Sequence, residues 1–356
     1  MRRTRSQLSE LRGALMFAWI LARKKYRPVR LPALASMAAV TALALTACGG
    51  GASSAPNSDG APVQLRVIES NKQDPTELGA EAGNYINIWS KCSPEVKVNL
   101  TAGEKVAEAL AAKSADIGIT SPNRVIGAVS QGLRGKIIGS SMPVWDQYVV
   151  VRKDSGAKSF SDLKGSTFAI SSFGSAGDYA TQKIAREEGW GPDDFKTVTM
   201  GSLDGIMAGL KSGTADAFLW SAQAAFGLEL EGSARVLGSV KDLVGPNAMT
   251  VVFATDEIIQ KNPAAVKAFA ECYYKATEAI MDDSGLATKM LVENWGMEPA
   301  LASKIIEKEI PMSSRDGELS PDQLEGLLEA TQFTIKSAKS LTIDDVKGMY
   351  KHWKSL

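Results

Sequence analysis

Histidine is almost absent from this chain, and cysteine is scarce. His352 is the single histidine, and the three cysteines are Cys48, Cys92 and Cys272. No two of these cysteines have the Cys-x-x-Cys spacing. Such an inventory cannot supply a zinc site, a Ser-His-Asp triad or a Cys-His nucleophilic pair. It therefore argues against most hydrolytic enzymes and predicts neither a metal nor another cofactor.

Acidic residues are nearly missing from the N-terminal region. The first thirty residues carry nine Arg or Lys residues against one acid, Glu10. An apolar run rich in Ala and Leu follows over residues 31–47, and it is short for a bilayer span, which takes about 20 residues. A basic segment, a short apolar core and then small residues are typical of a secretory signal. We therefore expect residues 1–47 to be a signal peptide, with a start at Met16 left open.

The apolar run ends in Leu45-Thr46-Ala47-Cys48, which resembles a bacterial lipobox. The resemblance implies cleavage before Cys48, transfer of a diacylglycerol group to its thiol, and a mature N-terminus held in the cell membrane by lipid such as palmitate. The alternatives are an ordinary signal peptide with an incidental cysteine, or an uncleaved anchor. Residues 48–62 are rich in Gly, Ser, Ala and Pro and are expected to form a flexible tether.

The mature chain is expected to be acidic. Removal of residues 1–47 leaves 31 basic and 39 acidic residues, a formal net charge of −8. An acidic domain repels the phosphates of nucleic acids, so we expect no nucleic-acid partner. Cys92 and Cys272 remain after lipidation, and they either form a disulfide or stay as two free buried thiols.

Strand-like and helix-like segments alternate through most of the mature chain. Apolar–polar alternation and β-branched runs predict strands at residues 64–70, 96–100, 116–120, 136–139, 148–152, 167–171, 197–200, 216–219, 235–237 and 249–254. Helical spacing between these strands, first over residues 75–90, indicates an α/β fold with two mainly parallel sheets flanked by helices, and the chain beyond residue 256 is almost wholly helical. The strands at 148–152 and 249–254 are where the chain could cross between the two units. We expect lobe 1 to comprise residues 63–151 and 251–356, and lobe 2 to comprise residues 152–250.

Several stretches resemble solute-binding proteins of bacterial importers, in the group that includes the alkanesulfonate, taurine and nitrate binders. They are residues 115–119 (ADIGI), 149–156 (VVVRKDSG), 161–165 (SDLKG), 174–175 (GS) and 210–217 (LKSGTADA). The resemblance implies a type 2 periplasmic-binding-protein-like fold, whose two lobes close on a ligand as a hinged clamp. It also implies a monomer that works with a membrane permease and a cytoplasmic ATPase of the ABC class. No Walker-type loop occurs here, so this chain is not the ATPase.

Ligands of open α/β sheets bind beyond the carboxyl ends of the strands. The candidate ligand-binding residues at such positions are Ser70, Asn71, Thr120, Ser121, Asn123, Trp145, Ser172, Gly174, Ser175, Ala176, Trp220 and Ser221. Gly174 allows a sharp turn before a helix that Ser175 can cap. Free N–H groups at such a helix start suit an anion, for example a sulfonate, nitrate, phosphate or carboxylate, and an ordinary capped helix is the alternative.

Two residues at or near the candidate site leave alternatives open. Trp220 is either an apolar wall of the pocket or a core tryptophan. Asp146 and Gln147 precede a crossing strand and could line the mouth of the cleft. Asp146 would disfavour a purely anionic ligand and favour an amine, as in a zwitterion, but its position is more typical of a surface loop.

The function expected from these observations is extracytoplasmic capture of a small anionic solute for an ABC importer, without enzymatic activity. One alternative is an enzyme of the same fold that makes the thiamine pyrimidine. That chemistry uses an active-site histidine beside a cysteine-rich iron site, and neither is recognisable here. The other alternative is a ligand sensor for a signalling receptor, which the sequence does not distinguish from a transport protein.

Overall fold

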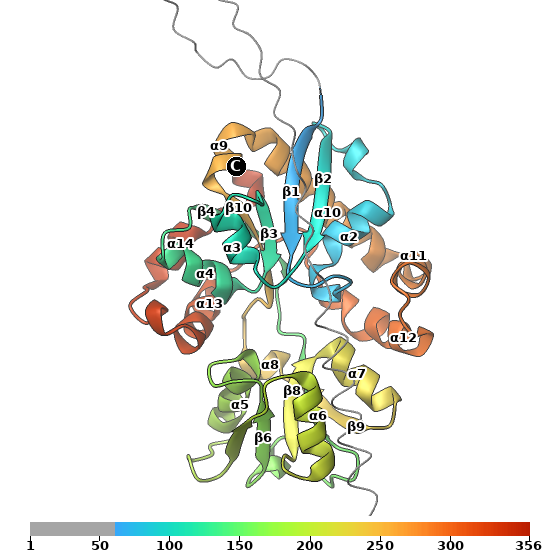
Figure 1. Ribbon diagram of the computed structural model, residues 1–356, viewed down its shortest axis with the longest axis vertical. Coiled ribbons are helices and arrows are strands. Elements are labelled where there is room, and N and C mark those ends of the chain that lie inside the picture. Colours follow the sequence, from blue (N-terminus) through green and yellow to red (C-terminus); the bar gives the residue numbers. More distant parts are fainter. Residues whose placement is uncertain (1–60) are drawn as a thin grey trace, which may run out of the picture. The chain divides into compact units, whose positions relative to one another are not determined.

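The computed structural model describes residues 61–356, which form two five-stranded sheets with helices on their faces (Figure 1). The predicted signal peptide, Cys48 and nearly all of the predicted tether lie outside the described residues. Within residues 61–356, no helix combines the length and apolar character needed to cross a membrane.

The first sheet has the strand order β2-β1-β3-β10-β4, and the second has the order β7-β6-β8-β5-β9. The strands of the first sheet are β1 (Val63–Glu69), β2 (Val96–Ala102), β3 (Ile117–Thr120), β4 (Gly135–Met142) and β10 (Thr250–Thr255). Those of the second sheet are β5 (Gln147–Arg152), β6 (Thr167–Ile170), β7 (Lys196–Thr199), β8 (Ala217–Ser221) and β9 (Ala234–Ser239). In each sheet one strand, β10 or β5, runs antiparallel to both of its neighbours, and the other four share a direction. The predicted α/β architecture is confirmed, and its sheets are mixed.

The chain passes between the sheets twice, through the residues that precede β5 and β10. It leaves the first sheet after Met142 and enters the second at Gln147; it returns after α8 (Lys241–Val244) and enters the first sheet at Thr250. All of β5 therefore lies in the second sheet, whereas the boundary expected at residue 151 assigned this strand to lobe 1. We call residues 143–146 and 245–249 the crossing segments.

Helices cover both faces of each sheet and make up most of the C-terminal region. They are α2 (Leu78–Tyr85), α3 (Val106–Ala111), α4 (Pro122–Ser130), α5 (Ala176–Glu187), α6 (Leu203–Ser212), α7 (Ala222–Leu230), α9 (Asp256–Lys261), α10 (Pro263–Asp282), α11 (Ser284–Thr288), α12 (Pro299–Lys308), α13 (Pro321–Thr334) and α14 (Ile343–Met349), besides α8. The single helix expected over residues 75–90 is instead broken. Asn87, with a φ of 51°, has left-handed backbone that cannot continue an α-helix.

The first sheet is held between two groups of helices. On one face, Leu65, Ile117 and neighbouring strand residues pack with Phe269 and Tyr273 of α10. On the other face, side chains of α3, α4, α13 and α14 pack together with Val251 and other residues of the sheet. The disulfide between Cys92 and Cys272, with an S–S distance of 2.09 Å, joins the segment before β2 to α10. The two cysteines that the sequence left open are therefore paired in the structure.

The second sheet shows the same arrangement, and β5 displays its two-residue side-chain period. Tyr148 and Val150 lie on the face covered by α6 and α7, whereas Val149 and Val151 face α5 and α8. Both faces of β5 are buried, which explains its uninterrupted β-branched sequence.

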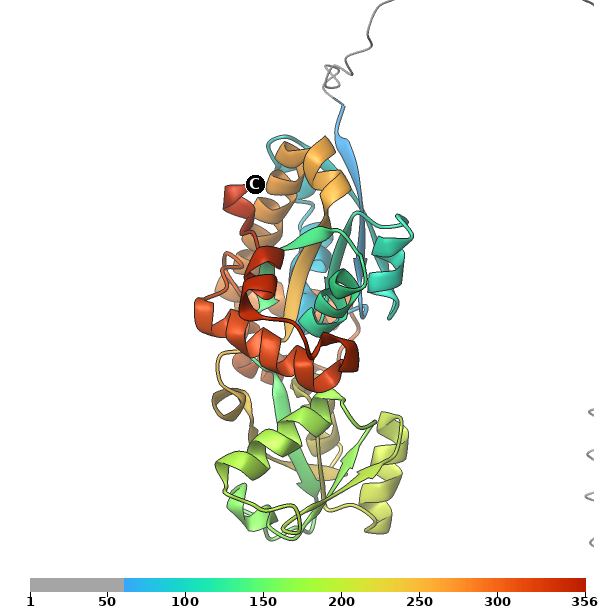
Figure 2. The ribbon, with the colours of Figure 1, turned by 90° about the vertical axis from the view of Figure 1, so that its left-hand side faces the viewer.

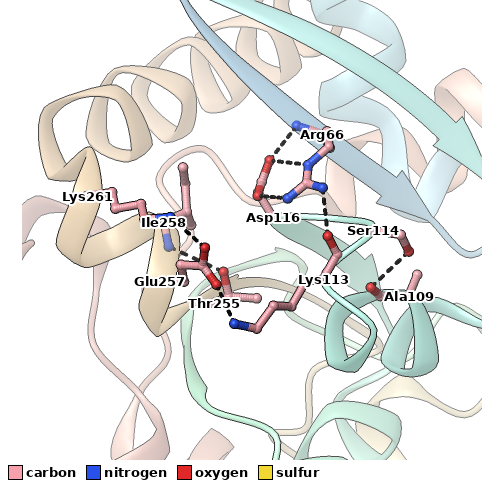
Figure 3. Close-up of polar contacts among 9 residues, drawn as sticks. All are labelled: Arg66, Ala109, Lys113, Ser114, Asp116, Thr255, Glu257, Ile258 and Lys261. Carbon is pink, nitrogen blue, oxygen red and sulfur yellow. Dashed lines mark hydrogen bonds and ion pairs between the residues drawn. The ribbon is translucent and has the colours of Figure 1, made fainter. Parts of the chain in front are cut away.

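A network of charged side chains lies at the N-terminal end of β3, the end opposite Ser121. The Arg66 guanidinium donates to both carboxylate oxygens of Asp116, at 3.0 and 2.6 Å, and to the backbone carbonyl of Lys113. Glu257 of α9 accepts from Lys261 and forms an ion pair with Lys113 (Figure 3). The network therefore joins β1, the residues before β3, and α9 at this end of the sheet.

Candidate functional site

A cavity of about 550 Å³ lies between the two sheets. It is reached by the carboxyl ends of β1, β3, β6 and β8, through residues such as Ser70, Ser121, Gly174 and Ser221. Both crossing segments also line it, and α13 closes one side. A cavity at the carboxyl ends of strands is where open α/β sheets usually bind ligands.

The structure brings ten of the twelve predicted ligand-binding residues to this cavity. They are Ser70, Asn71, Ser121, Asn123, Trp145, Gly174, Ser175, Ala176, Trp220 and Ser221. The other two lie elsewhere. Thr120 is fully buried, and its hydroxyl receives a 2.7 Å hydrogen bond from the Ser70 hydroxyl. Ser172 is exposed, and its carbonyl accepts the Ser175 N–H in the turn before α5.

Side chains of the first turn of α5 accept hydrogen bonds from the backbone N–H groups at the start of this helix. The Ser175 hydroxyl accepts the N–H of Asp178 at 3.2 Å, which makes Ser175 the N-cap. The Asp178 carboxylate in turn accepts the N–H of Gly174 at 2.8 Å. A carboxylate in the first turn already provides the negative charge that a helix N-terminus favours. The anion site expected at residues 172–176 is therefore partly filled by Asp178.

The starts of α4 and α7 differ from that of α5. Their N-cap residues, Ser121 and Ser221, line the cavity, and within residues 61–356 neither side chain makes a capping hydrogen bond. The exposed Arg124, from the first turn of α4, also lines the cavity, and its Nη1 donates to the backbone carbonyl of Glu104 at 2.8 Å. The Ala222 N–H at the start of α7 lies beside the Asp146 carboxylate. The start of α4 and the other N–H groups of this guanidinium thus remain available to a negatively charged group.

Several lining residues were not recognised in the sequence as part of the site. They are Asp74, Thr76, Glu77, Pro122, Arg124, Asn247, Ala248, Met249, Thr250, Ala330, Thr331 and Thr334. Asp146 and Gln147, considered only for the mouth of the cleft, line the cavity too, and Asp146 is fully buried, so its assignment to a surface loop was wrong. The antiparallel strands β5 and β10 begin at the edge where the parallel strands end, so the residues before them reach the cavity. This strand direction was the missing signal.

A family model described as NMT1/THI5 like matches residues 95–285. The chain belongs to this NMT1/THI5-like family. Among curated protein sequences, none matches it.

Solved structures similar to this NMT1/THI5-like protein include binding proteins and an enzyme. The periplasmic aliphatic sulphonate binding protein SsuA of Escherichia coli is 18% identical over 82% of this chain and 93% of its own, with a TM-score of 0.68. The alkanesulfonate-binding protein SsuA of Xanthomonas axonopodis pv. citri, bound to MOPS, is 18% identical over 82% and 99%, with a TM-score of 0.62. A mutant of the desulfurization enzyme DszB, in complex with biphenyl-2-sulfinic acid, is 16% identical over 82% and 97%, also at 0.62. These similarities confirm the predicted periplasmic-binding-protein fold, which an enzyme shares.

The cavity of this NMT1/THI5-like protein contains more acidic than basic groups. Asp74, Glu77 and Asp146 line it, against the one guanidinium of Arg124. Burial raises the pKa of Glu77 well above its ordinary value, and the nearby Asp74 charge raises it further. Burial likewise raises the pKa of Asp146, which also interacts with the buried carboxyl of Glu309 behind it.

Ion pairs join the two lobes on either side of the cavity. On one side, Glu329 of α13 pairs with Lys183 and Arg186 of α5, which lies next to it (Figure 2). On another side, Lys304 of α12 pairs with Glu229 of α7. Helices of the C-terminal region therefore contact the second lobe directly, besides the covalent connection through the crossing segments.

Proposed function

We propose that this protein binds a small organic solute between its lobes and delivers it unchanged to a membrane importer of the ABC class. The observation that carries this proposal is the cavity of about 550 Å³, because both sheets and both crossing segments contribute to it. Groups drawn from two lobes allow the lobes to close around a ligand. The named sulfonate-binding structures with the same fold support the proposal.

The proposed solute carries an anionic group such as a sulfonate, a nitrate or a carboxylate. The uncapped start of α4 and the Arg124 guanidinium provide the N–H groups and the positive charge for this group. Ser121 and Ser221 add one hydroxyl each. The side chain of Trp220 provides an apolar wall for the organic part, and it also packs against the core below.

Binding without chemical change is favoured over catalysis by the composition of the cavity. Its described lining contains no cysteine and no histidine. His352 instead lies near the C-terminus, with its Nε2 3.0 Å from the Asp316 carbonyl, and the two described cysteines form the disulfide. A thiamine-pyrimidine-type reaction would therefore lack its histidine at the cavity. A sensor role differs from transport only in its partner, and co-purification with a permease and its ATPase would distinguish the two.

The proposed location is the extracytoplasmic face of the cell membrane, with a monomer anchored by lipid on Cys48. The support is the lipobox-like sequence that ends at this cysteine. Mass spectrometry of the protein from the cell envelope should find an acylated N-terminal Cys48. An unmodified cysteine in a longer chain would contradict the anchor and leave solute binding untouched.

The solute-binding function is tested by thermal unfolding with a panel of sulfonates, nitrate, carboxylates and aromatic acids. A ligand at 100 times its Kd that binds only the native state should raise the unfolding free energy by about 2.7 kcal/mol. At least one member should therefore raise the melting temperature, and mass spectrometry should recover that compound unchanged afterwards. Release of a chemically altered product would contradict the proposal.

A further inference from the structure

Four side chains that line the cavity carry buried oxygen atoms without a hydrogen-bond partner, and each of these atoms can accept a hydrogen bond. Both carboxylate oxygens of Asp146, Oε1 of Gln147, Oδ1 of Asn247 and Oγ1 of Thr331 have no hydrogen-bond partner among the described residues. All four residues line the cavity, and their exposed fractions are 0, 7, 1 and 0%, respectively. A buried acceptor without a donor is costly, so a ligand that enters here gains by presenting N–H or O–H groups.

The orientation of Asn247 is fixed by its surroundings. Its Nδ2 donates to the backbone carbonyl of Gly326 at 3.1 Å, and a carbonyl oxygen can only accept. The other end of the amide, Oδ1, must therefore be the acceptor that lacks a donor. Asn247 lies in one crossing segment and Asp146 in the other, so acceptors come from both connections between the lobes.

Asp146 differs from the other two carboxyl groups of the cavity. Glu77 accepts the N–H groups of Ser70 and Asn71, at 2.7 and 3.4 Å. Asp74 accepts the N–H and the hydroxyl of Thr76, at 2.9 and 2.8 Å. Neither oxygen of Asp146 makes a hydrogen bond of comparable geometry. The Ala222 N–H and the buried Glu309 carboxyl lie beside this carboxylate, and both lower the pKa of Asp146 against the effect of burial, whereas the Asp146 charge raises the pKa of Glu309. A cation next to Asp146 would provide a donor and a charge partner for its carboxylate.

We propose that the solute carries a protonated amine, which binds the Asp146 carboxylate with Asn247 Oδ1 as a further acceptor, in addition to its anionic group. This inference rests on the proposed solute-binding function and narrows the ligand from simple anions to zwitterions. The two charged ends of the solute then have separate sites in the cavity. The amine lies at Asp146, beside the start of α7, and the anionic group lies at the start of α4 with Arg124.

The test compares matched ligands by isothermal titration calorimetry with the full mature chain. Aminoalkanesulfonates and amino acids are paired with the alkanesulfonates and carboxylates of the same chain length that lack the amine. The wild-type protein should bind the aminated member of its best pair at least about tenfold more tightly, since a charge-assisted hydrogen bond in a buried site replaces an unpaired acceptor. Asp146→Asn should reduce this preference to within about threefold, because the amide keeps the shape of the side chain and loses its charge. Asp193→Asn, at an exposed position outside the cavity, should leave the preference unchanged.

The possible outcomes separate this inference from the function on which it rests. Equal or tighter binding of the amine-free members by the wild-type protein would overturn the inference, and solute binding would stand. A preference that survives Asp146→Asn in a variant with a wild-type circular dichroism spectrum would overturn the role of Asp146. If Asp146→Asn does not fold, the comparison within the wild-type protein still decides for or against the amine. Absence of binding by every pair would overturn the proposed anionic-solute function and this inference with it.

Discussion

Glu329 of α13 and Lys183 of α5 form an ion pair in which Oε2 lies 2.9 Å from Nζ, although the two helices belong to different lobes. The Lys183 side chain is only 11% exposed. The second oxygen of Glu329 lies 3.2 Å from the Arg186 guanidinium. This carboxylate therefore joins the lobes at a place where it is only partly screened by water.

Glu329→Gln should weaken solute binding, because the variant loses the charge that holds α13 to α5 when the lobes are closed. Partly exposed ion pairs contribute about 0.2–1 kcal/mol, so we expect a loss of affinity of roughly 1.4- to fivefold. The loss should diminish in high salt. Calorimetric titration measures the affinity, and Glu325→Gln, an exposed position one turn earlier in α13, is the matched control. Equal affinities for both variants would show that the pair does not stabilise the solute-bound form.

Ser175→Ala should mainly lower stability, whereas Ser221→Ala should mainly lower the affinity for the solute. Ser175 caps α5, and its loss should lower the free energy of unfolding by about 1 kcal/mol. Ser221 makes no side-chain capping bond in the described chain, so its loss should lower affinity with little change in stability. Urea unfolding and calorimetric titration measure the two quantities. Ser202→Ala, which removes the cap of α6 outside the cavity, should lower stability alone.

The contribution of Glu69 to the stability of the protein should fall as the pH rises from about 4.5 towards 10. Burial raises the pKa of Glu69 from 4.5 to about 10, and the neighbouring Glu81 and Glu77 contribute. Because the folded state holds this proton more strongly than the unfolded state, the stabilisation is complete below about pH 4.5 and is lost as the pH approaches 10.

Glu69→Gln should flatten this dependence, since a neutral amide has no proton to lose. At pH 8 we expect the variant to be more stable than the wild-type protein by more than about 1 kcal/mol, and at pH 4.5 the difference should vanish. Melting temperatures across this range provide the measurement. The exposed Glu95→Gln is the control, and an equal slope for wild type and Glu69→Gln would contradict the assignment.

Reduction of the disulfide should destabilise the protein. Cys92 and Cys272 are 180 residues apart, and a link across so long a loop restricts the unfolded chain. Removal of a native disulfide typically costs about 2–5 kcal/mol. Urea unfolding with and without dithiothreitol measures this cost. The Cys92→Ser/Cys272→Ser double variant should be about as stable as the reduced wild-type protein, and dithiothreitol should not lower its stability further.

The alternation of strands and helices was predictable from the sequence because it depends on local side-chain periodicity. β5 is the clearest case, since burial of both faces leaves an unbroken apolar, β-branched run. The break at Asn87 was not predictable, because it depends on one residue in left-handed backbone within an otherwise helical pattern. The sequence also assigned β5 to the wrong lobe, because the residue pattern of a strand does not show which strands pair with it.

The candidate site was predictable to the extent that it follows the carboxyl ends of parallel strands. Ser121 and Ser221 were found by this rule. Asn247 was not placed in the cavity, and for Asp146 a surface loop was preferred over the mouth of the cleft, because both residues precede strands whose antiparallel direction the sequence does not reveal. Thr331 was missed for a different reason. It lies on a helix far along the chain from the last lining serine of the second lobe, and only the tertiary fold brings it to the cavity.

α13 follows nearly all of the chain in sequence, yet it supplies Thr331 and Thr334 to the cavity wall and receives the amide of Asn247 on its Gly326 carbonyl. A chain that is still emerging from a ribosome has both sheets before it has this wall. The cavity is therefore complete only after α13 has folded, so an incompletely synthesised chain would not compete with folded molecules for the solute.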